Sequence, residues 1–176
     1  MGALGLSSPK KSAKTLQIIH DGVKERYNFE VERIKRLDDK ANYIMGIASI
    51  LAALVSGLAS SSIKTAFFVA NIVLFVTSLI LLISSFLFGL RAYQFRGYNI
   101  IPDCPSLLTQ CANMTPEKVI ETLAYNYTLA TEDNSATNEK KIWNIKVASN
   151  LILASLVFFG IFAIITILAN GGGMTG

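Results

Sequence analysis

The sequence has little from which to build a catalytic or metal centre. Its 176 residues include one histidine and two cysteines, too few for a zinc site. It contains no phosphate-binding loop, dinucleotide fingerprint or HExxH motif, and the single histidine completes no convincing Ser-His-Asp set. Asp38 and Asp39 are adjacent and would point about 100° apart on a helix, which is poor geometry for acid–base work. We therefore expect neither an enzyme nor a bound cofactor.

Charged residues are missing where ion-coupled transport would need them. Three apolar blocks, at about residues 41–62, 66–90 and 147–169, contain no Asp, Glu, Lys or Arg near their middle. Proton relays and ion-coupled transport therefore have no obvious carrier. Any pore would be lined by Ser, Asn and Thr and would be poorly selective.

What the sequence does contain is apolar segments of membrane-spanning length. Hydrophobic residues make up 52% of the chain. Each block reaches the roughly 20 residues that a helix needs to cross a hydrocarbon core about 30 Å thick. The turn SSSIKT between the first two blocks is too short for anything but an antiparallel hairpin. The sequence predicts an all-α membrane protein with three transmembrane helices, a hairpin at 41–90 plus a third span at 147–169, and long cytoplasmic helical extensions.

The basic residues predict the orientation of the chain in the bilayer. Of the sixteen Lys and Arg, nine precede the first span, one (Lys64) lies in the hairpin turn, six separate the second and third spans, and none follows. By the positive-inside rule the N-terminus is cytoplasmic and the C-terminus outside, in a multi-pass protein of the cell membrane. Tyr43, Tyr93 and Trp143 fall where each span would meet the cytoplasmic interface. The formal charge of +4 is then explained by topology and anionic lipid rather than nucleic acid.

The segment before the first span predicts one long helix. Residues 1–13 are rich in Gly, Ser and Lys and predict disorder. From 14 to 40 a cytoplasmic helix is expected, and no Gly or Pro interrupts the sequence between Val23 and Gly46, so the helix should continue into the first span. Its inner positions recur on alternating three- and four-residue steps, which is typical of a weak coiled-coil seam. They are Leu16, His20, Val23, Tyr27, Glu30, Ile34, Leu37 and Ala41.

Residues 91–146 predict a cytoplasmic connector with a second helix. Gly97, Pro102 and Pro105 prevent regular structure in its first part. Thr115 as cap, followed by Pro116 and an acidic residue, marks a helix start at 116. The apolar face of this helix should pack on the N-terminal helix. TEDNSATN, residues 131–138, is expected to loosen it, and residues 170–176 predict a flexible tail.

Small and polar residues form stripes along the first two spans. In the first span, Ser49, Ala53 and Gly57 repeat at four-residue spacing, which allows another helix to approach closely. The stripes at seven-residue spacing are Asn42, Ser49 and Ser56 in the first span and Asn71, Ser78 and Ser85 in the second. Two interpretations remain open: these residues hydrogen-bond between packed helices, or they line a water-filled path in an oligomer.

The junction Arg36-Leu-Asp-Asp-Lys-Ala-Asn-Tyr-Ile-Met-Gly46 places a Leu-Asp-x-Lys-Ala motif directly before the membrane hairpin. This arrangement, over about the first ninety residues, resembles the small membrane effectors of prokaryotic nucleotide-signalled defence systems, the SLATT and Pycsar transmembrane effector families. The resemblance implies an oligomer that opens or disrupts the inner membrane when a sensor or partner signals. The chain departs from those families in having no recognisable nucleotide-sensing domain.

Two hypotheses about function follow. In the first, the chain is a homo-oligomeric, pore-forming or channel-like effector in antiviral defence, gated through its cytoplasmic helices. In the second, it is a non-conducting membrane anchor or assembly subunit that binds a cytoplasmic signalling partner. The residues expected to bind that partner are Ile34, Leu37, Leu123 and Tyr127.

Overall fold

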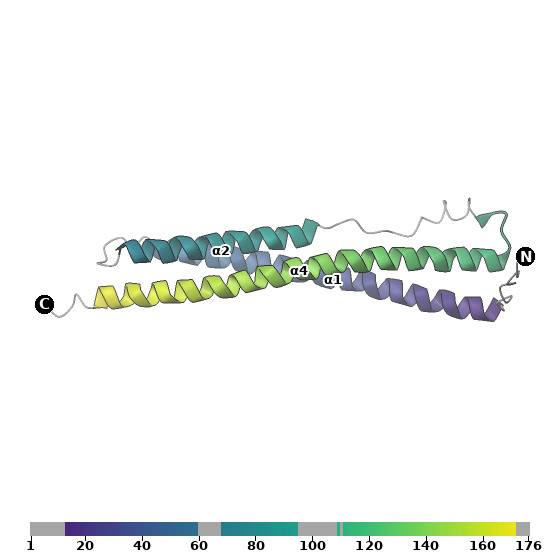
Figure 1. Cartoon of the computed structure of the whole chain (residues 1–176), viewed down its shortest axis with the longest axis horizontal. Helices are drawn as coiled ribbons and strands as arrows, with labels where there is room; N and C mark the ends of the chain where they lie inside the picture. Colours follow the sequence, from purple (N-terminus) through teal and green to yellow (C-terminus); the bar gives the residue numbers. More distant parts are fainter. Residues whose placement is uncertain (1–12, 60–67, 95–108, 110, 172–176) are drawn as a thin grey trace, which may run out of the picture. The chain divides into compact units, whose positions relative to one another are not determined.

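The computed structural model of the chain describes residues 13–59, 68–94, 109 and 111–171. All of these except residues 109 and 111–115 belong to three long helices, α1 (Ala13–Ala59), α2 (Phe68–Gln94) and α4 (Pro116–Gly171), and no strand occurs among the described residues (Figure 1). All three helices are long and apolar enough to cross a membrane, with best-window mean hydropathies of 1.3, 2.5 and 2.9. The predicted all-α fold with three membrane-spanning helices is confirmed.

The chain divides into two compact units, and α1 and α4 each contribute to both. Unit 1 comprises residues 1–33 and 97–136, and unit 2 comprises residues 34–96 and 137–176. In unit 1, the predicted seam of α1 faces inward: Leu16 and Glu30 are buried, and His20, Val23 and Tyr27 are half-buried. The expected packing between α1 and the helix that begins at Pro116 is confirmed by ring contacts of His20 and Tyr27 with Tyr127.

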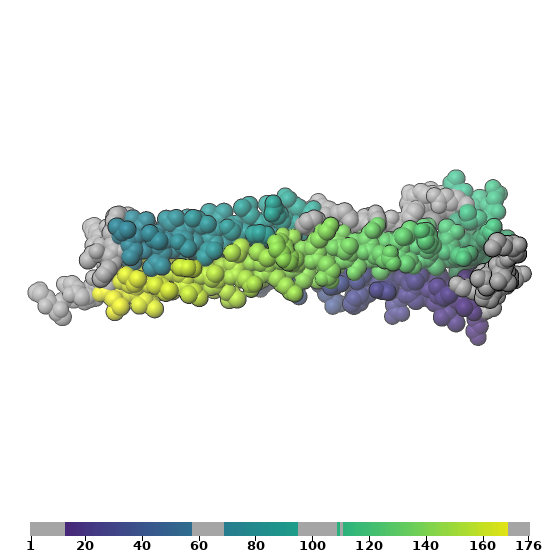
Figure 2. Space-filling view, in the orientation of Figure 1, coloured from purple at the N-terminus to yellow at the C-terminus, as the bar shows by residue number. Residues whose placement is uncertain are grey.

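Unit 2 is a three-helix bundle whose buried positions recur every seven residues. On α1 the seam runs through Ile34, Leu37 and Ala41 and continues to Ala48 and Val55. The corresponding buried positions are Asn71, Ser78, Ser85 and Ala92 on α2, and Lys141, Ala148, Ser155 and Phe162 on α4. A strict seven-residue repeat keeps one stripe of each helix facing the bundle axis, as in a coiled coil. Figure 2 shows α2 in contact with the C-terminal part of α4 along its length.

The outer surface of unit 2 is apolar. Large aliphatic side chains on all three helices are more than half exposed, including Ile50 (64%), Val69 (74%), Leu153 (62%) and Ile167 (69%). An apolar surface of this extent would be strongly unfavourable in water and is the surface that a hydrocarbon environment requires. Burial and exposure therefore agree with helix length in describing a multi-pass membrane protein.

Helix α4 is continuous at one place where the local sequence predicts a looser helix. Residues 131–138, expected to loosen the second long helix, are fully helical within α4, so that expectation is wrong. Asn134 and Asn138 have no exposed surface, so this part of α4 is packed within the fold, and that tertiary packing overrides the weak helix propensity of Asn, Asp, Ser and Thr. α1 is unbroken from Ala13 to Ala59, as the absence of Gly and Pro from its middle predicts.

Several expectations concern residues outside the described part of the chain. These are the disorder at residues 1–12, the hairpin turn at 60–67, most of the irregular first part of the connector, at 95–108, and the flexible tail at 172–176.

Candidate functional site

A lysine buried against an aspartate is the most unusual feature of unit 2. Lys141 lies on the inner seam of α4 with 1% of its side chain exposed, and its Nζ donates a hydrogen bond to Oδ1 of Asp38 on α1, which is 30% exposed. An ammonium group removed from water is costly unless a carboxylate compensates it. The pair therefore ties α1 to α4 with a charge-dependent contact at the end of the bundle where the apolar spans begin.

Further polar side chains surround this ion pair on α4. Asn138 is fully buried and Asn144 is 5% exposed. The Asn144 side-chain amide donates to the Lys140 carbonyl over 2.9 Å. We name Asp38, Asn138, Lys141 and Asn144 the buried polar segment. Hydrogen bonds in a low-dielectric interior are strong when satisfied and costly when broken, so this segment is sensitive to any relative movement of α1 and α4.

Sequence analysis missed the buried polar segment. The sequence indicates Lys141 only as one of the basic residues that mark the cytoplasmic side, and Asp38 only as a member of the Leu-Asp-x-Lys-Ala junction and as a neighbour of Asp39. One sequence signal was available: Lys141 precedes Ala148 by seven residues and Ser155 by fourteen, so it lies on the same stripe as two small seam residues. The carboxylate that it meets is 103 positions away and could not be read from that spacing.

The polar stripe of the second span faces α4 inside the chain. Ser78 and Ser155 place their hydroxyl oxygens 2.9 Å apart, and the Ser155 hydroxyl also lies 3.1 Å from the Ser78 carbonyl. The Ser85 hydroxyl donates to the Ala148 carbonyl over 2.8 Å. Asn71, the third member of the stripe, is 2% exposed. These contacts are helix–helix hydrogen bonds within a single chain, spaced seven residues apart on both helices.

The polar stripe of the first span lies on the exposed surface of α1 and not between helices of the chain. Asn42, Ser49 and Ser56 are exposed, and so are Ala53 and Gly57. The Ser49 hydroxyl donates to the Met45 carbonyl of its own helix over 2.9 Å. This set of five residues, which we name the outer α1 face, takes no part in the core of its own bundle.

Close approach of helices within the chain occurs instead at Gly89 of α2. A Cβ atom at Gly89 would lie 2.8 Å from Cγ of Met45 and 3.7 Å from the carbonyl oxygen of Ala41, whereas one at Gly57 would meet no atom within 4 Å. Sequence analysis did not single out Gly89. Its position four residues after Ser85 and three before Ala92, on the seam of α2, was the available signal.

The residues expected to bind a cytoplasmic partner are divided between the units. In unit 1, Tyr127 packs edge-on against Tyr27, with ring centroids 5.4 Å apart, and against His20 at 5.6 Å. Leu123, one turn earlier, is half-buried. Ile34 and Leu37 are each 7% exposed in the core of unit 2. Three of the four side chains thus serve packing within their own unit.

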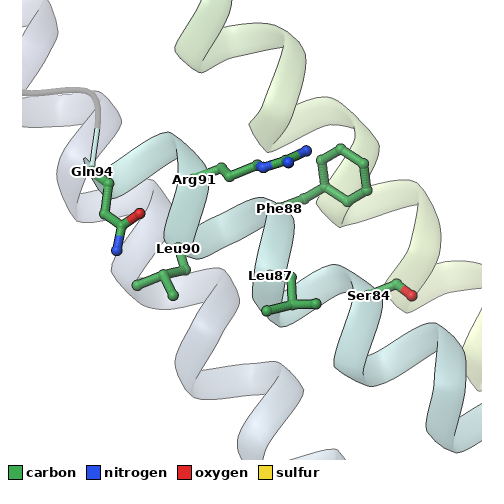
Figure 3. Close-up of a pocket in the computed structure, with 6 residues that line it drawn as sticks. All are labelled: Ser84, Leu87, Phe88, Leu90, Arg91 and Gln94. Atoms are coloured by element: carbon green, nitrogen blue, oxygen red, sulfur yellow. The ribbon is translucent and has the colours of Figure 1, made fainter.

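A hollow lies over the end of α2. Its described lining consists of Ser84, Leu87, Phe88, Leu90, Arg91 and Gln94 (Figure 3). The Arg91 guanidinium carbon lies 6.0 Å from the centre of the Phe88 ring, and that ring meets Trp143 of α4 edge-on at 5.9 Å. The hollow therefore combines an apolar wall with a cationic rim. Within the described ranges no group of three His, Cys, Asp or Glu is placed to hold a metal ion.

No protein-family model, curated protein or solved structure matches this chain.

Proposed function

We propose that the chain is a homo-oligomeric integral membrane protein that acts as a pore-forming or channel-like effector gated through its cytoplasmic helices. The N-terminus is cytoplasmic and the C-terminus outside in this proposal, which follows from the distribution of Lys and Arg. The resemblance of residues 36–46 to membrane effectors of prokaryotic defence supports a role in antiviral defence.

The observation that carries the proposal is the exposure of the outer α1 face. Ser49 and Ser56 place hydroxyls on the surface of a helix that is otherwise suited to lipid, and Asn42 adds an amide near the cytoplasmic end of the same face. Polar groups facing hydrocarbon are unfavourable. Ser49, Ala53 and Gly57 present little bulk on the same side, which permits close helix contact. A second copy of the chain covering this face would remove the polar groups from lipid. Several copies around an axis would direct them toward a water-filled path.

The polar stripe of the second span has a structural role in this proposal and does not line the path. Because Ser78 and Ser85 already bond to α4, they hold each subunit together, and the outer α1 face is the better candidate for the path. The buried polar segment supplies a contact that a signal could break. To move a two-state population from almost closed to almost open, a signal must favour the open state by about 5.5 kcal/mol.

Ion flux from liposomes containing the purified protein tests the proposal. We expect flux from a defined oligomer and loss of flux without loss of assembly when Asn42 and Ser49 are replaced by Leu. Thr128→Leu is the matched control, because Thr128 is an exposed polar residue on α4 in unit 1. Unchanged flux in the Asn42 and Ser49 variants would remove the outer α1 face from the conduction path.

The alternative is a non-conducting anchor or assembly subunit that binds a cytoplasmic partner. The burial of Ser78 and Ser85 favours it, since hydroxyls engaged in packing line no path. This alternative predicts no conductance in any state and release of a co-purifying partner by Leu123→Glu. Because Ile34 and Leu37 lie in the core of unit 2, Leu37→Glu would disturb folding first, and Leu123 is the cleaner test. Retained partner binding in Leu123→Glu would count against the anchor.

A further inference from the structure

The hollow at the end of α2 has the chemistry of an amphiphile site. Leu87 and Leu90 provide an apolar wall, and Arg91 and Gln94 provide a polar rim one turn further along the helix (Figure 3). Arg91 is exposed, and among the residues that the structure describes no carboxylate forms an ion pair with it. Its described interaction is the contact with the Phe88 ring, toward which its side chain extends (Figure 3), and a guanidinium carries five N–H donors that can serve a further partner.

The charges of unit 2 gather at the same end of the bundle as this hollow. The described residues of unit 2 include seven Lys or Arg and three Asp or Glu, all within 35–40, 91 and 139–146. The contacts of Asp38 with Lys141 and of Phe88 with Trp143 place these segments at one end of the bundle. One of the three acids, Asp38, is already paired with Lys141. That end therefore presents net positive charge directly beside the apolar surface of the spans.

We infer that the hollow binds an anionic phospholipid, with the phosphate at Arg91 and an acyl chain along Leu87 and Leu90. A guanidinium donates to two phosphate oxygens at once, which favours Arg over Lys for such a contact. Basic pockets at the ends of membrane helices recognise anionic headgroups in this way. Trp143, 59% exposed beside Phe88, is suited to the headgroup level, where amphipathic rings prefer to lie. The inference requires only that the chain spans a membrane, and it holds whether or not the protein conducts ions.

Native mass spectrometry of lipid retained per chain tests the inference. The full chain is reconstituted with equal amounts of phosphatidylcholine and phosphatidylglycerol and then extracted. We expect wild type to retain phosphatidylglycerol preferentially and Arg91→Gln to retain about fivefold less, the contribution of one basic residue near an anionic surface. Arg91→Lys should restore part of the retention, which separates loss of charge from loss of folding. Equal retention by wild type and Arg91→Gln would overturn the inference.

Two further variants distinguish a specific lipid site from nonspecific attraction of anionic lipid to the basic end of the bundle. Lys146→Gln removes the same charge from an exposed position outside the described lining and should leave retention nearly unchanged. An equal loss in Lys146→Gln and Arg91→Gln would mean that the basic end attracts anionic lipid without a site. Leu87→Trp places a larger side chain in the hollow, where the acyl chain would lie. It should lower the retention of phosphatidylglycerol although Arg91 is intact.

Titration with glycerol 3-phosphate in detergent distinguishes a lipid from a free phosphate. We expect glycerol 3-phosphate not to displace phosphatidylglycerol, because it lacks the acyl chain. Efficient displacement, together with unchanged retention in Leu87→Trp, would identify a free-phosphate site and overturn the lipid assignment. Neither readout depends on ion flux or on oligomer number, so failure here and failure of the proposed channel function are distinguishable.

Discussion

Lys141 of α4 donates a hydrogen bond to Asp38 of α1 from a side chain that is 1% exposed. Two long helices that contribute to both units are thus joined, within unit 2, by a contact that depends on opposite charges. A buried ion pair is weak evidence for net stability, because desolvation offsets much of the attraction. Breaking such a pair is costly, because it leaves one charge in a low-dielectric site.

Removing the carboxylate alone should destabilise the protein strongly. We expect Asp38→Ala to lower the free energy of unfolding by about 3 kcal/mol, at the lower end for a broken buried pair because Asp38 is 30% exposed. The double replacement Asp38→Leu with Lys141→Met should recover most of that loss, since no charge is then buried. SDS titration in mixed micelles, followed by circular dichroism, measures the free energy of unfolding of the single and the double variant. Lys140→Met, at an exposed neighbouring position, is the control. A double variant as unstable as Asp38→Ala would contradict this account of the pair.

The hydrogen bonds between Ser78 of α2 and Ser155 of α4 should contribute modestly to the free energy of unfolding. A double-mutant cycle of Ser78→Ala and Ser155→Ala is expected to give a coupling of about 0.6 kcal/mol, the average found for hydrogen bonds between membrane helices. The value is small because each hydroxyl finds other acceptors when the helices separate in the membrane. Thr128→Ala removes an exposed hydroxyl that bonds to Ala124 of its own helix and should have no measurable effect. A coupling near zero would mean that the serines serve only as small residues.

Gly89 and Gly160 form a matched pair for testing close helix contact. Replacing a helical Gly by Ala gains about 1 kcal/mol in helix propensity. At Gly160 a Cβ meets no atom within 4 Å, so Gly160→Ala should realise that gain. At Gly89 the new Cβ would lie 2.8 Å from Cγ of Met45, a flexible side chain, and displacing it should cost about 1 kcal/mol or slightly more. We expect Gly89→Ala to be neutral or slightly destabilising. Equal gains in both variants would show that the Met45 side chain moves aside at little cost.

The fold was predictable where the signal is local or periodic. The number of membrane-spanning helices follows from the apolar blocks, the continuation of α1 follows from the lack of Gly and Pro between Val23 and Gly46, and the α1 seam follows from its three- and four-residue steps. Two features were not predictable. The stripes that contain Ser49 and Ser78 have the same spacing and the same kinds of residue, so their sequences do not determine that one is exposed and the other buried. Lys141 is buried because Asp38 of another helix compensates its charge, and no local pattern encodes that pairing.

The aromatic cluster of unit 1 should stabilise the first part of α1. Tyr127→Ala removes ring contacts with both His20 and Tyr27, and each such contact contributes about 0.5–1.5 kcal/mol beyond the burial of area. We expect faster amide hydrogen exchange over residues 13–33, corresponding to a loss of about 2 kcal/mol. Tyr125→Ala, at a position that is 63% exposed on the same helix, should leave exchange unchanged. Similar acceleration in both variants would show that helix α4, rather than the cluster, had been weakened.

The outer α1 face should control assembly without controlling the fold of a single chain. Ala53 and Gly57 are exposed, and a Cβ at Gly57 would meet no atom within 4 Å, so we expect the surface of α1 to accommodate Ala53→Leu and Gly57→Leu. We expect the stability of Ala53→Leu to stay within about 0.5 kcal/mol of wild type, and Gly57→Leu to be at least as stable as wild type because Leu has the higher helix propensity. If a second copy covers this face, the added side chains prevent its close approach, and light scattering in detergent should report a smaller assembly.

Ala41→Leu provides the control for this prediction. Ala41 is fully buried on the same helix, so the larger side chain overpacks the bundle and should cost about 1–3 kcal/mol of stability. A loss of stability in Ala41→Leu with normal stability in Gly57→Leu would separate the inner seam of α1 from its outer face. Unchanged assembly in both Ala53→Leu and Gly57→Leu would remove that face from any contact between subunits. The channel proposal would then lose the observation that carries it, and the anchor would become the better account.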